Sequence, residues 1–201
     1  MIPKKTCARF GTCGILEYVM GRTAIVLLLL LGLAVPAAAD QSDPRLDRLF
    51  EQLYHAPDPL AAQAVEHAIW EIWLTSEDEV VNALMGEGVA AMQRRDFPTA
   101  LRSFDRMVEV APDYAEGWNK RATLYYLIGA YEDSLDDIVR TLELEPRHFG
   151  ALSGRGMILQ DLGRSEEALT AFEAALDLNP QMPGARVSVE ALRKLLEDSA
   201  I

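Results

Sequence analysis

Hydrophobic residues recur at intervals of three and four positions along most of the chain after residue 43. Two such stretches, residues 44–54 and 60–75, flank the Pro-Asp-Pro sequence at 57–59, and another runs from 185 to 198. Side chains three and four positions apart lie on one face of an α-helix. This pattern predicts an all-α protein with a helix pair near its start and a single amphipathic helix near its end.

Between these ends the sequence repeats itself every 34 residues. Proline marks the period at Pro112, Pro146 and Pro180. Three other sets of similar residues, which we call columns, are also spaced by 34 positions. They are Phe104, Ile138 and Phe172; Ala100, Ser134 and Ala168; and Gly88, Ala122 and Gly156. Self-similarity at a period of this length indicates stacked structural units that bury their faces against one another.

The pattern resembles the tetratricopeptide repeat. The residues that carry the resemblance are most complete in the second copy: Trp118, Ala122, Tyr125, Gly129, Tyr131, Ser134, Ile138 and Pro146. The resemblance implies an all-α superhelix of three helix-turn-helix repeats, at residues 81–114, 115–148 and 149–182. The chain departs from the family pattern three positions after the Trp column, where a large apolar residue is usual and this sequence has Glu87, Arg121 and Arg155.

Several columns have an expected structural role. Small residues such as Gly88 let the first helix of a repeat approach the second closely. Gly129 and Gly163 are expected to end first helices, because glycine adopts the left-handed conformation found at helix C-termini. Asp96 and Ser165 are expected to cap the second helices that follow.

Repeats that bury their faces only against neighbours need polar ends. We therefore expect residues 40–80 to form a degenerate N-terminal cap, in which Trp70 takes the place that Phe104 has 34 residues later. Residues 183–201 are expected to form a C-terminal capping helix. Trp70 and Trp73 share a helical face, and they either pack within the cap or form an aromatic site for a partner.

An export signal is predicted before the repeats. Residues 25–35 are apolar and uncharged, follow Arg22 and lead into Ala37-Ala38-Ala39. This order is typical of a secretory signal peptide with cleavage after the last of these alanines. We expect residues 1–39 to be removed, with Met20 as a candidate translation start, and the mature protein to be soluble and periplasmic or secreted.

Charge narrows the range of partners. The 201 residues include 31 acidic and 19 basic side chains, a net charge of −12 at pH 7. This balance opposes the phosphate neutralisation that nucleic-acid binding requires, so no nucleic-acid partner is expected. Removal of residues 1–39 would make the protein more acidic still, because that segment has four basic side chains and one acidic one.

Chemically reactive side chains are few and scattered. His55, His67 and His148 fall in different predicted elements without metal-ligand spacing, and Cys7 and Cys13 precede the predicted cleavage site. No motif indicates a serine or cysteine nucleophile beside a histidine. We therefore predict no catalytic residue, no metal site and no cofactor.

The resemblance implies a protein partner, held on a concave surface that first-helix residues line. Counted from each repeat start, the expected groove residues are Met85, Val89, Met92, Asn119, Lys120, Thr123, Tyr126, Ser153, Met157 and Gln160. Family members that bind chaperone tails use a clamp of several Lys, Arg and Asn residues here, and only Asn119 and Lys120 suit that role. We therefore expect an adaptor that takes a helix or extended peptide by apolar contacts, with Asn119 and Lys120 orienting it.

Other interpretations remain open at this point. An uncleaved segment at residues 23–39 would make the protein a membrane-tethered assembly factor of the cell envelope, and an enzyme is the least favoured reading. Within the family, a self-associating scaffold would hold the terminus of another copy in its groove. The pairs Asp136-Asp137 and Glu166-Glu167 are expected to be solvated, with an acidic docking surface as the alternative.

Overall fold

The structure is a computed structural model that describes residues 40–199. The predicted signal peptide at residues 1–39, and the membrane anchor that is its alternative, lie outside the described residues. After a short 3-10 helix at Asp40–Ser42, the described residues form nine α-helices and no strand, which confirms the all-α prediction. The helices are α2 Arg45–Tyr54, α3 Pro59–Leu74, α4 Glu79–Gln93, α5 Phe97–Val110, α6 Ala115–Leu127, α7 Tyr131–Leu144, α8 Phe149–Asp161, α9 Ser165–Leu178 and α10 Pro183–Ser199. None of these nine is long and apolar enough to cross a membrane.

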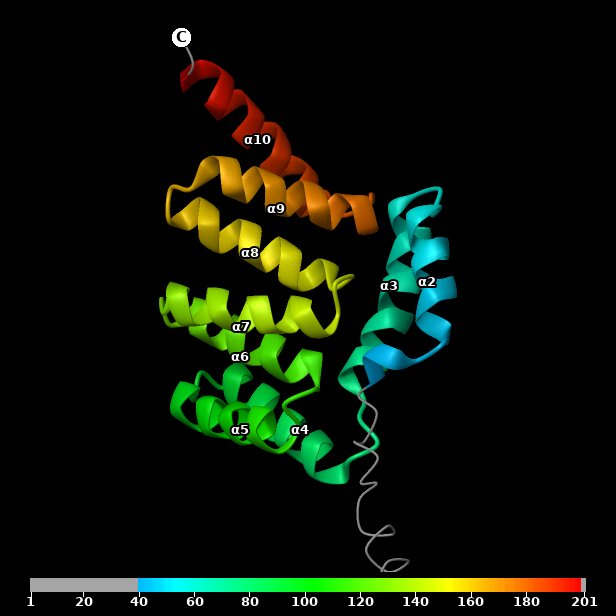
Figure 1. The fold of residues 1–201 in the computed structure, drawn as a ribbon, viewed down its shortest axis with the longest axis vertical. Coiled ribbons are helices and arrows are strands. Elements are labelled where there is room, and N and C mark those ends of the chain that lie inside the picture. The colour runs from blue at the N-terminus through cyan, green and yellow to red at the C-terminus, as the bar shows by residue number, and fades with distance from the viewer. Residues whose placement is uncertain (1–39, 200–201) are drawn as a thin grey trace, which may run out of the picture. The chain divides into compact units, whose positions relative to one another are not determined.

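Six of the helices form three pairs that stack in sequence order, as Figure 1 shows. α4 pairs with α5, α6 with α7 and α8 with α9, and each second helix also packs against the first helix of the next pair. α10 packs on α9 through the buried side chains of Ala185, Val189 and Leu192. The expected superhelix of helix pairs is therefore confirmed.

Backbone conformation sets the turns within the pairs. Gly129 and Gly163 have φ angles of 78° and 72°, in the left-handed region that glycine adopts without steric cost, and they follow α6 and α8 as predicted. Arg95, which follows α4, adopts the same left-handed conformation with a φ angle of 59°. Asp96 accepts a hydrogen bond from a backbone N–H in the first turn of α5, as predicted. Ser165 is instead the first residue of α9, whose N-terminus has no side-chain cap, so that prediction is wrong.

Glycine in the first helix allows close packing against the second. A Cβ atom at Gly88 would lie 2.3 Å from the Phe104 ring, and one at Gly156 would lie 2.8 Å from the Phe172 ring. Both distances are shorter than a Cβ contact allows. The predicted close approach of the paired helices therefore depends on these two glycines.

Two substitutions in α4 test this packing. Gly88→Ala should lower the free energy of unfolding by about 1–3 kcal/mol, the usual cost of overpacking. Gly86→Ala should raise it by about 0.5–1 kcal/mol, because alanine favours the helix and no atom lies within 4 Å of a Cβ built there. Chemical denaturation of both variants measures the difference. Equal stabilisation of the two would contradict the tight contact between Gly88 and Phe104.

The helix pair α2–α3 forms as predicted, but it does not stack on the first repeat. Figure 1 shows both helices beside the ends of the later repeat helices, and they contact α9 and α6. Their apolar side chains share a core with Phe149, Leu178 and Met182. The expected position of residues 40–80 is corrected accordingly: this pair joins repeats two and three instead of covering the end of repeat one.

Trp70 illustrates the correction. Phe104 is fully buried within its own helix pair, whereas Trp70 is half-buried and points out of its pair toward the third repeat. Its ring lies edge-on to the rings of His148 and Phe149, with centroid distances of 5.4 and 5.6 Å. The prediction that Trp70 takes the place of Phe104 is therefore wrong. The prediction that Trp70 and Trp73 share a face is confirmed, since both rings contact His148.

Candidate functional site

A hollow of about 450 Å³ lies between α6 and α8 and is bordered by α3. We call it the α6–α8 groove. Its lining residues are Glu66, Trp70, Asn119, Ala122, Thr123, Tyr126, Leu127, Ser134, Ile138, Phe149, Gly150, Ser153, Gly154, Met157, Ile158 and Met182. The lining is mostly apolar, and its polar side chains are uncharged apart from Glu66.

The structure brings together half of the predicted groove residues. Those that line the α6–α8 groove come from the second and third repeats: Asn119, Thr123, Tyr126, Ser153 and Met157. The three from the first repeat do not reach it. Met85 is buried in the core of that repeat, and Val89 and Met92 pack partly buried against the same core. Gln160 is exposed on α8 outside the lining, and Lys120 lies beside the groove in contact with α3.

Two glycines on α8 shape the groove. A Cβ atom at Gly154 would have only one near neighbour, the Ile138 Cδ1 atom at 3.8 Å, so glycine leaves space here. A Cβ atom at Gly150 would lie 2.8 Å from the Trp70 ring. Gly150 therefore lets the indole of Trp70 lie directly against the first turn of α8, where it forms one end wall of the groove.

Helix α3 supplies a part of the site that the predicted groove residues do not include. Trp70 and Glu66 lie one turn apart on α3 and both line the groove. The side-chain amide of Asn179, which follows α9, donates a hydrogen bond to Glu66 Oε1 and holds α3 in place. The pair of tryptophans was the one signal in the sequence for an aromatic wall.

A buried polar cluster lies beside this wall. His148 Nδ1 accepts the Ala151 N–H at 3.0 Å, which caps α8, so the proton of the neutral imidazole is on Nε2. Nε2 then donates to Glu116 Oε2 at 2.9 Å. Asn119 donates to the same carboxylate oxygen at 2.9 Å, and Lys120 Nζ lies 2.8 Å from Oε1. The cluster therefore engages both polar residues that were expected to orient a ligand.

The surroundings of Glu116 keep it ionised although it is 1% exposed. Burial acts to raise the pKa of this carboxyl, but the hydrogen bond from His148 and the charge of Lys120 outweigh it and hold the pKa below its ordinary value. Lys120 also lies over the Trp70 ring, 5.5 Å from its centroid. Its positive charge is thus balanced by protein groups and is not free for an acidic ligand.

Beside the opposite end of the groove, two tyrosine hydroxyls share one carboxylate oxygen. The hydroxyls of Tyr126 and Tyr131 donate to Asp161 Oδ2 at 3.1 and 3.4 Å. The two rings are stacked with centroids 5.8 Å apart. Burial, followed by the hydrogen bond to Asp161, raises the pKa of Tyr126.

The acidic pairs on the second helices differ from expectation. Asp137 is 4% exposed and accepts two hydrogen bonds of 2.8 Å from Arg121, which also reaches Asp105 at 2.9 Å. The prediction that Asp137 is solvated is therefore wrong. Arg121 stands where the family has a large apolar residue, and the ion pairs replace that apolar contact. Asp136, Glu166 and Glu167 are exposed as predicted.

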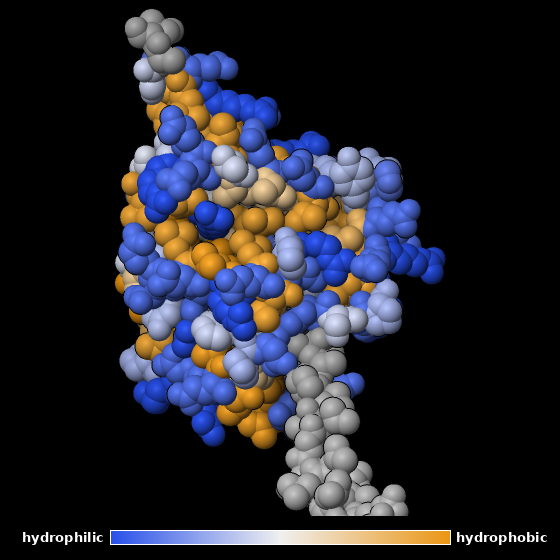
Figure 2. Space-filling model, viewed as in Figure 1, coloured by the Kyte–Doolittle hydropathy of each residue, from blue (hydrophilic) through white to orange (hydrophobic). Residues whose placement is uncertain are grey.

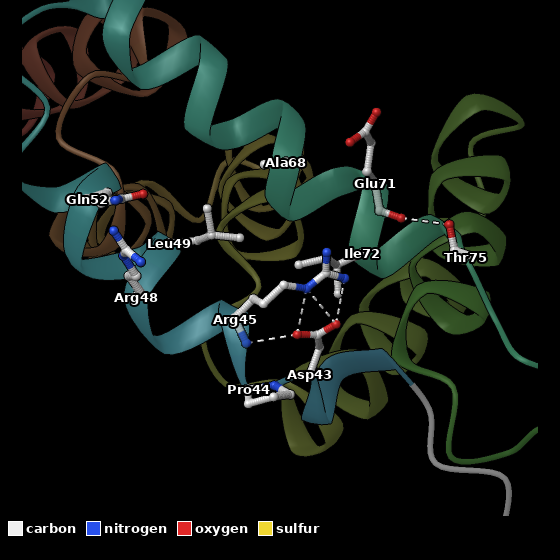
Figure 3. A pocket seen from close by; sticks show the side chains of 10 residues that line it. All are labelled: Asp43, Pro44, Arg45, Arg48, Leu49, Gln52, Ala68, Glu71, Ile72 and Thr75. Atoms are coloured by element: carbon white, nitrogen blue, oxygen red, sulfur yellow. Dashed lines mark hydrogen bonds and ion pairs between the residues drawn. The ribbon is translucent and has the colours of Figure 1, made fainter.

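A second hollow, of about 840 Å³, lies between α2 and α3 (Figure 3). Leu49, Ala68 and Ile72 contribute its apolar part, and Arg45 at its margin forms an ion pair of 2.7 Å with Asp43. It contains none of the predicted groove residues and no residue of the repeats. Among the described residues, no cluster of His, Cys, Asp and Glu is arranged to hold a metal ion.

Comparisons with known proteins agree with the fold. Two family models described as tetratricopeptide repeat match the chain, one over residues 85–142 and one over residues 149–182. A TPR repeat-containing protein of Rhizobium etli is 39% identical over 159 residues, which cover 79% of this chain and 78% of that relative. The chain therefore belongs to the tetratricopeptide repeat family.

Solved structures show the same helix arrangement. The Sgt2 TPR domain from Aspergillus fumigatus superposes with a TM-score of 0.58 at 22% identity, over 61% of this chain and 83% of that domain. The first TPR of Spaghetti (RPAP3), bound to the HSP90 peptide SRMEEVD, has a TM-score of 0.58 at 19% identity, over 60% of this chain and 96% of that domain. At these identities the likeness concerns the fold.

Proposed function

We propose that this protein is a binding adaptor that holds a short apolar segment of a partner protein in the α6–α8 groove. The observation that carries the proposal is a hollow within the range of about 300–1,000 Å³ typical of ligand sites, lined mainly by apolar groups on two repeats. The peptide bound to the first TPR of Spaghetti supports a peptide as the class of ligand. Apolar side chains that face such a space gain free energy when a partner covers them.

Binding in this groove differs from a charged clamp. Asn119 is 7% exposed and donates to Glu116, and Lys120 pairs with the same carboxylate. We therefore assign recognition to the apolar lining and to the aromatic walls of Trp70 and Tyr126. Met157, which is 44% exposed, adds a flexible contact that adapts to side chains of different shape.

A peptide library tests this function. The full chain would be used to select from phage-displayed random twelve-residue peptides, in parallel with Gly154→Leu, which fills the groove, and Gly86→Leu, which adds the same side chain to the first repeat. Gly154 and Gly86 are open to a Cβ atom, so both variants should fold. We expect apolar peptides that bind the wild type and Gly86→Leu but not Gly154→Leu. Peptides that bind all three equally, or none at all, would contradict the proposal.

Tyr126 should contribute strongly to the affinity of such peptides. Its ring lines the groove, and central aromatic residues of an interface typically lose about 2 kcal/mol or more on truncation. We expect Tyr126→Ala to weaken binding about 30-fold, at 1.4 kcal/mol per tenfold. Fluorescence anisotropy with a selected peptide measures the change, and Tyr54→Ala, at an exposed tyrosine on α2, is the control. An unchanged affinity for Tyr126→Ala would place the ligand elsewhere.

We further propose that the protein is exported and cleaved after Ala39. The apolar run at 25–35, the preceding Arg22 and the alanines at 37–39 support this proposal. Sequencing the N-terminus of protein purified from its own cells should give Asp40. Retention of residues 23–39 in a membrane fraction would support the membrane-tethered assembly factor instead.

A further inference from the structure

The α6–α8 groove has carboxylates at both ends. Glu66 lines the end formed by α3. Asp161 is outside the lining but lies beside the other end, where it accepts a hydrogen bond from the lining residue Tyr126. Trp70 contacts Gly150 in the first turn of α8, and Asp161 is the last residue of that helix. At 1.5 Å per residue, about 16 Å of helix separates the two ends.

The end at Asp161 combines three features that attract a cation. Its carboxylate is fixed in position by the hydroxyls of Tyr126 and Tyr131. The two stacked tyrosine rings lie beside it, and aromatic rings attract lysine and arginine side chains. Both α6 and α8 end here, and helix C-termini carry a partial negative charge.

Within residues 40–199, no lysine or arginine side chain forms an ion pair with Asp161. Lys120, which lies beside the groove, is bound to Glu116 near the opposite end, one turn into α6. Arg164, which follows α8 in the sequence, forms hydrogen bonds of 2.7 Å with both carboxylate oxygens of Glu167. The negative net charge of −12 adds a long-range attraction for basic ligands.

Building on the proposed groove, we propose that Asp161, Tyr126 and Tyr131 form a subsite for a lysine or arginine side chain of the bound segment. The partner is then an apolar segment with a basic residue at the end that lies over the C-terminus of α8. The peptide SRMEEVD of the solved TPR complex is acidic, so the basic residue proposed here has the opposite charge.

The peptide library described above separates this subsite from the groove as a whole. Peptides that depend on the groove, judged by loss of binding to Gly154→Leu, should carry Lys or Arg at one end of their apolar stretch. Because Gly154→Leu has the same net charge as the wild type, general attraction of basic peptides to an acidic protein is removed from the comparison. Selection on Asp161→Asn should yield apolar peptides without this basic residue.

A double-mutant cycle then measures the contact. A selected peptide should bind Asp161→Asn about 3–5-fold more weakly than the wild type, since the variant removes an exposed ion pair while both tyrosine rings remain. The same peptide with its basic residue replaced by glutamine should bind both proteins equally. Asp136→Asn, an equal charge change at an exposed position of α7, should alter affinity less than twofold.

The outcomes distinguish the two proposals. Groove-dependent peptides that lack a basic residue, that prefer acidic ends, or that bind Asp161→Asn as tightly as the wild type would overturn the cation subsite and leave the adaptor intact. Failure to select any groove-dependent peptide would overturn both. If Asp136→Asn weakened binding as much as Asp161→Asn, net charge alone would explain the effect, and the subsite would be overturned.

Discussion

Replacing Trp73 by alanine should lower the free energy of unfolding by about 3–5 kcal/mol, the range for large aromatic residues removed from cores. The Trp73 side chain is 2% exposed and stacks on the His148 ring, with centroids 4.3 Å apart and planes inclined by 10°. It also packs against Phe50 and Phe149. Its loss leaves a cavity where α2, α3 and the start of α8 meet.

The measurement is denaturation followed by far-ultraviolet circular dichroism, with hydrogen exchange to locate the change. Amides of α2 and α3 should exchange faster, while those of α4 and α5 keep their protection, because the pair does not stack on the first repeat. Leu60→Ala is the control on the same helix, since Leu60 is 77% exposed. A loss below 1 kcal/mol for Trp73→Ala would mean that the pair is held by other contacts.

Removing the carboxylate of Glu116 should cost about 3–5 kcal/mol, as for other broken buried ion pairs. Glu116→Ala leaves the His148 Nε2 proton and the Asn119 amide without their acceptor, and Lys120 without its counter-charge. Glu116→Gln keeps one oxygen acceptor for His148 and Asn119 but replaces the other carboxylate oxygen by an NH2 group, so it should lose less than Glu116→Ala. Thermal denaturation at neutral pH compares the two variants.

Glu116 also predicts a dependence of stability on pH. Its pKa in the folded protein is lower than its ordinary value of 4.5, so its ionised form favours the folded state above that value. This contribution is lost as the pH falls from about 4.5 through the lower folded pKa. The stability of Glu116→Gln should therefore change less than that of the wild type in this acid range. Parallel acid-denaturation curves for the two proteins would contradict the lowered pKa.

The repeat architecture could be predicted because each repeat packs against its neighbours in the sequence. The columns at Gly88 and Phe104, for example, meet within one helix pair, and the 34-residue period reports that contact directly. The groove residues of repeats two and three followed from the same register. The burial of Met85 could not be predicted in this way, because periodicity assigns a helix face without showing whether the side chain is buried in the core.

Contacts that do not follow the 34-residue period could not be predicted from the sequence. Arg121 and Asp137 replace an apolar contact by an ion pair, and nothing in either residue alone indicates the other. His148 and Glu116 pair across a repeat boundary. The wall formed by α3 was missed because a single tryptophan in register with Phe104 favoured a stacked cap, whereas aromatic partners in the third repeat determine where Trp70 lies.

The position of α2 and α3 also affects the order of folding. Gln181 donates a hydrogen bond to the Ala56 carbonyl oxygen across 125 positions of the sequence, a separation far beyond the local contacts of a regular repeat array. Non-local contacts of this kind slow folding, because the intervening chain must be ordered before they form. During synthesis from the N-terminus, the first helix pair emerges early but makes its contacts with α9 only after the third repeat is complete. Its apolar face is therefore exposed for most of that time, and this pair is where we expect a chaperone to bind the nascent chain.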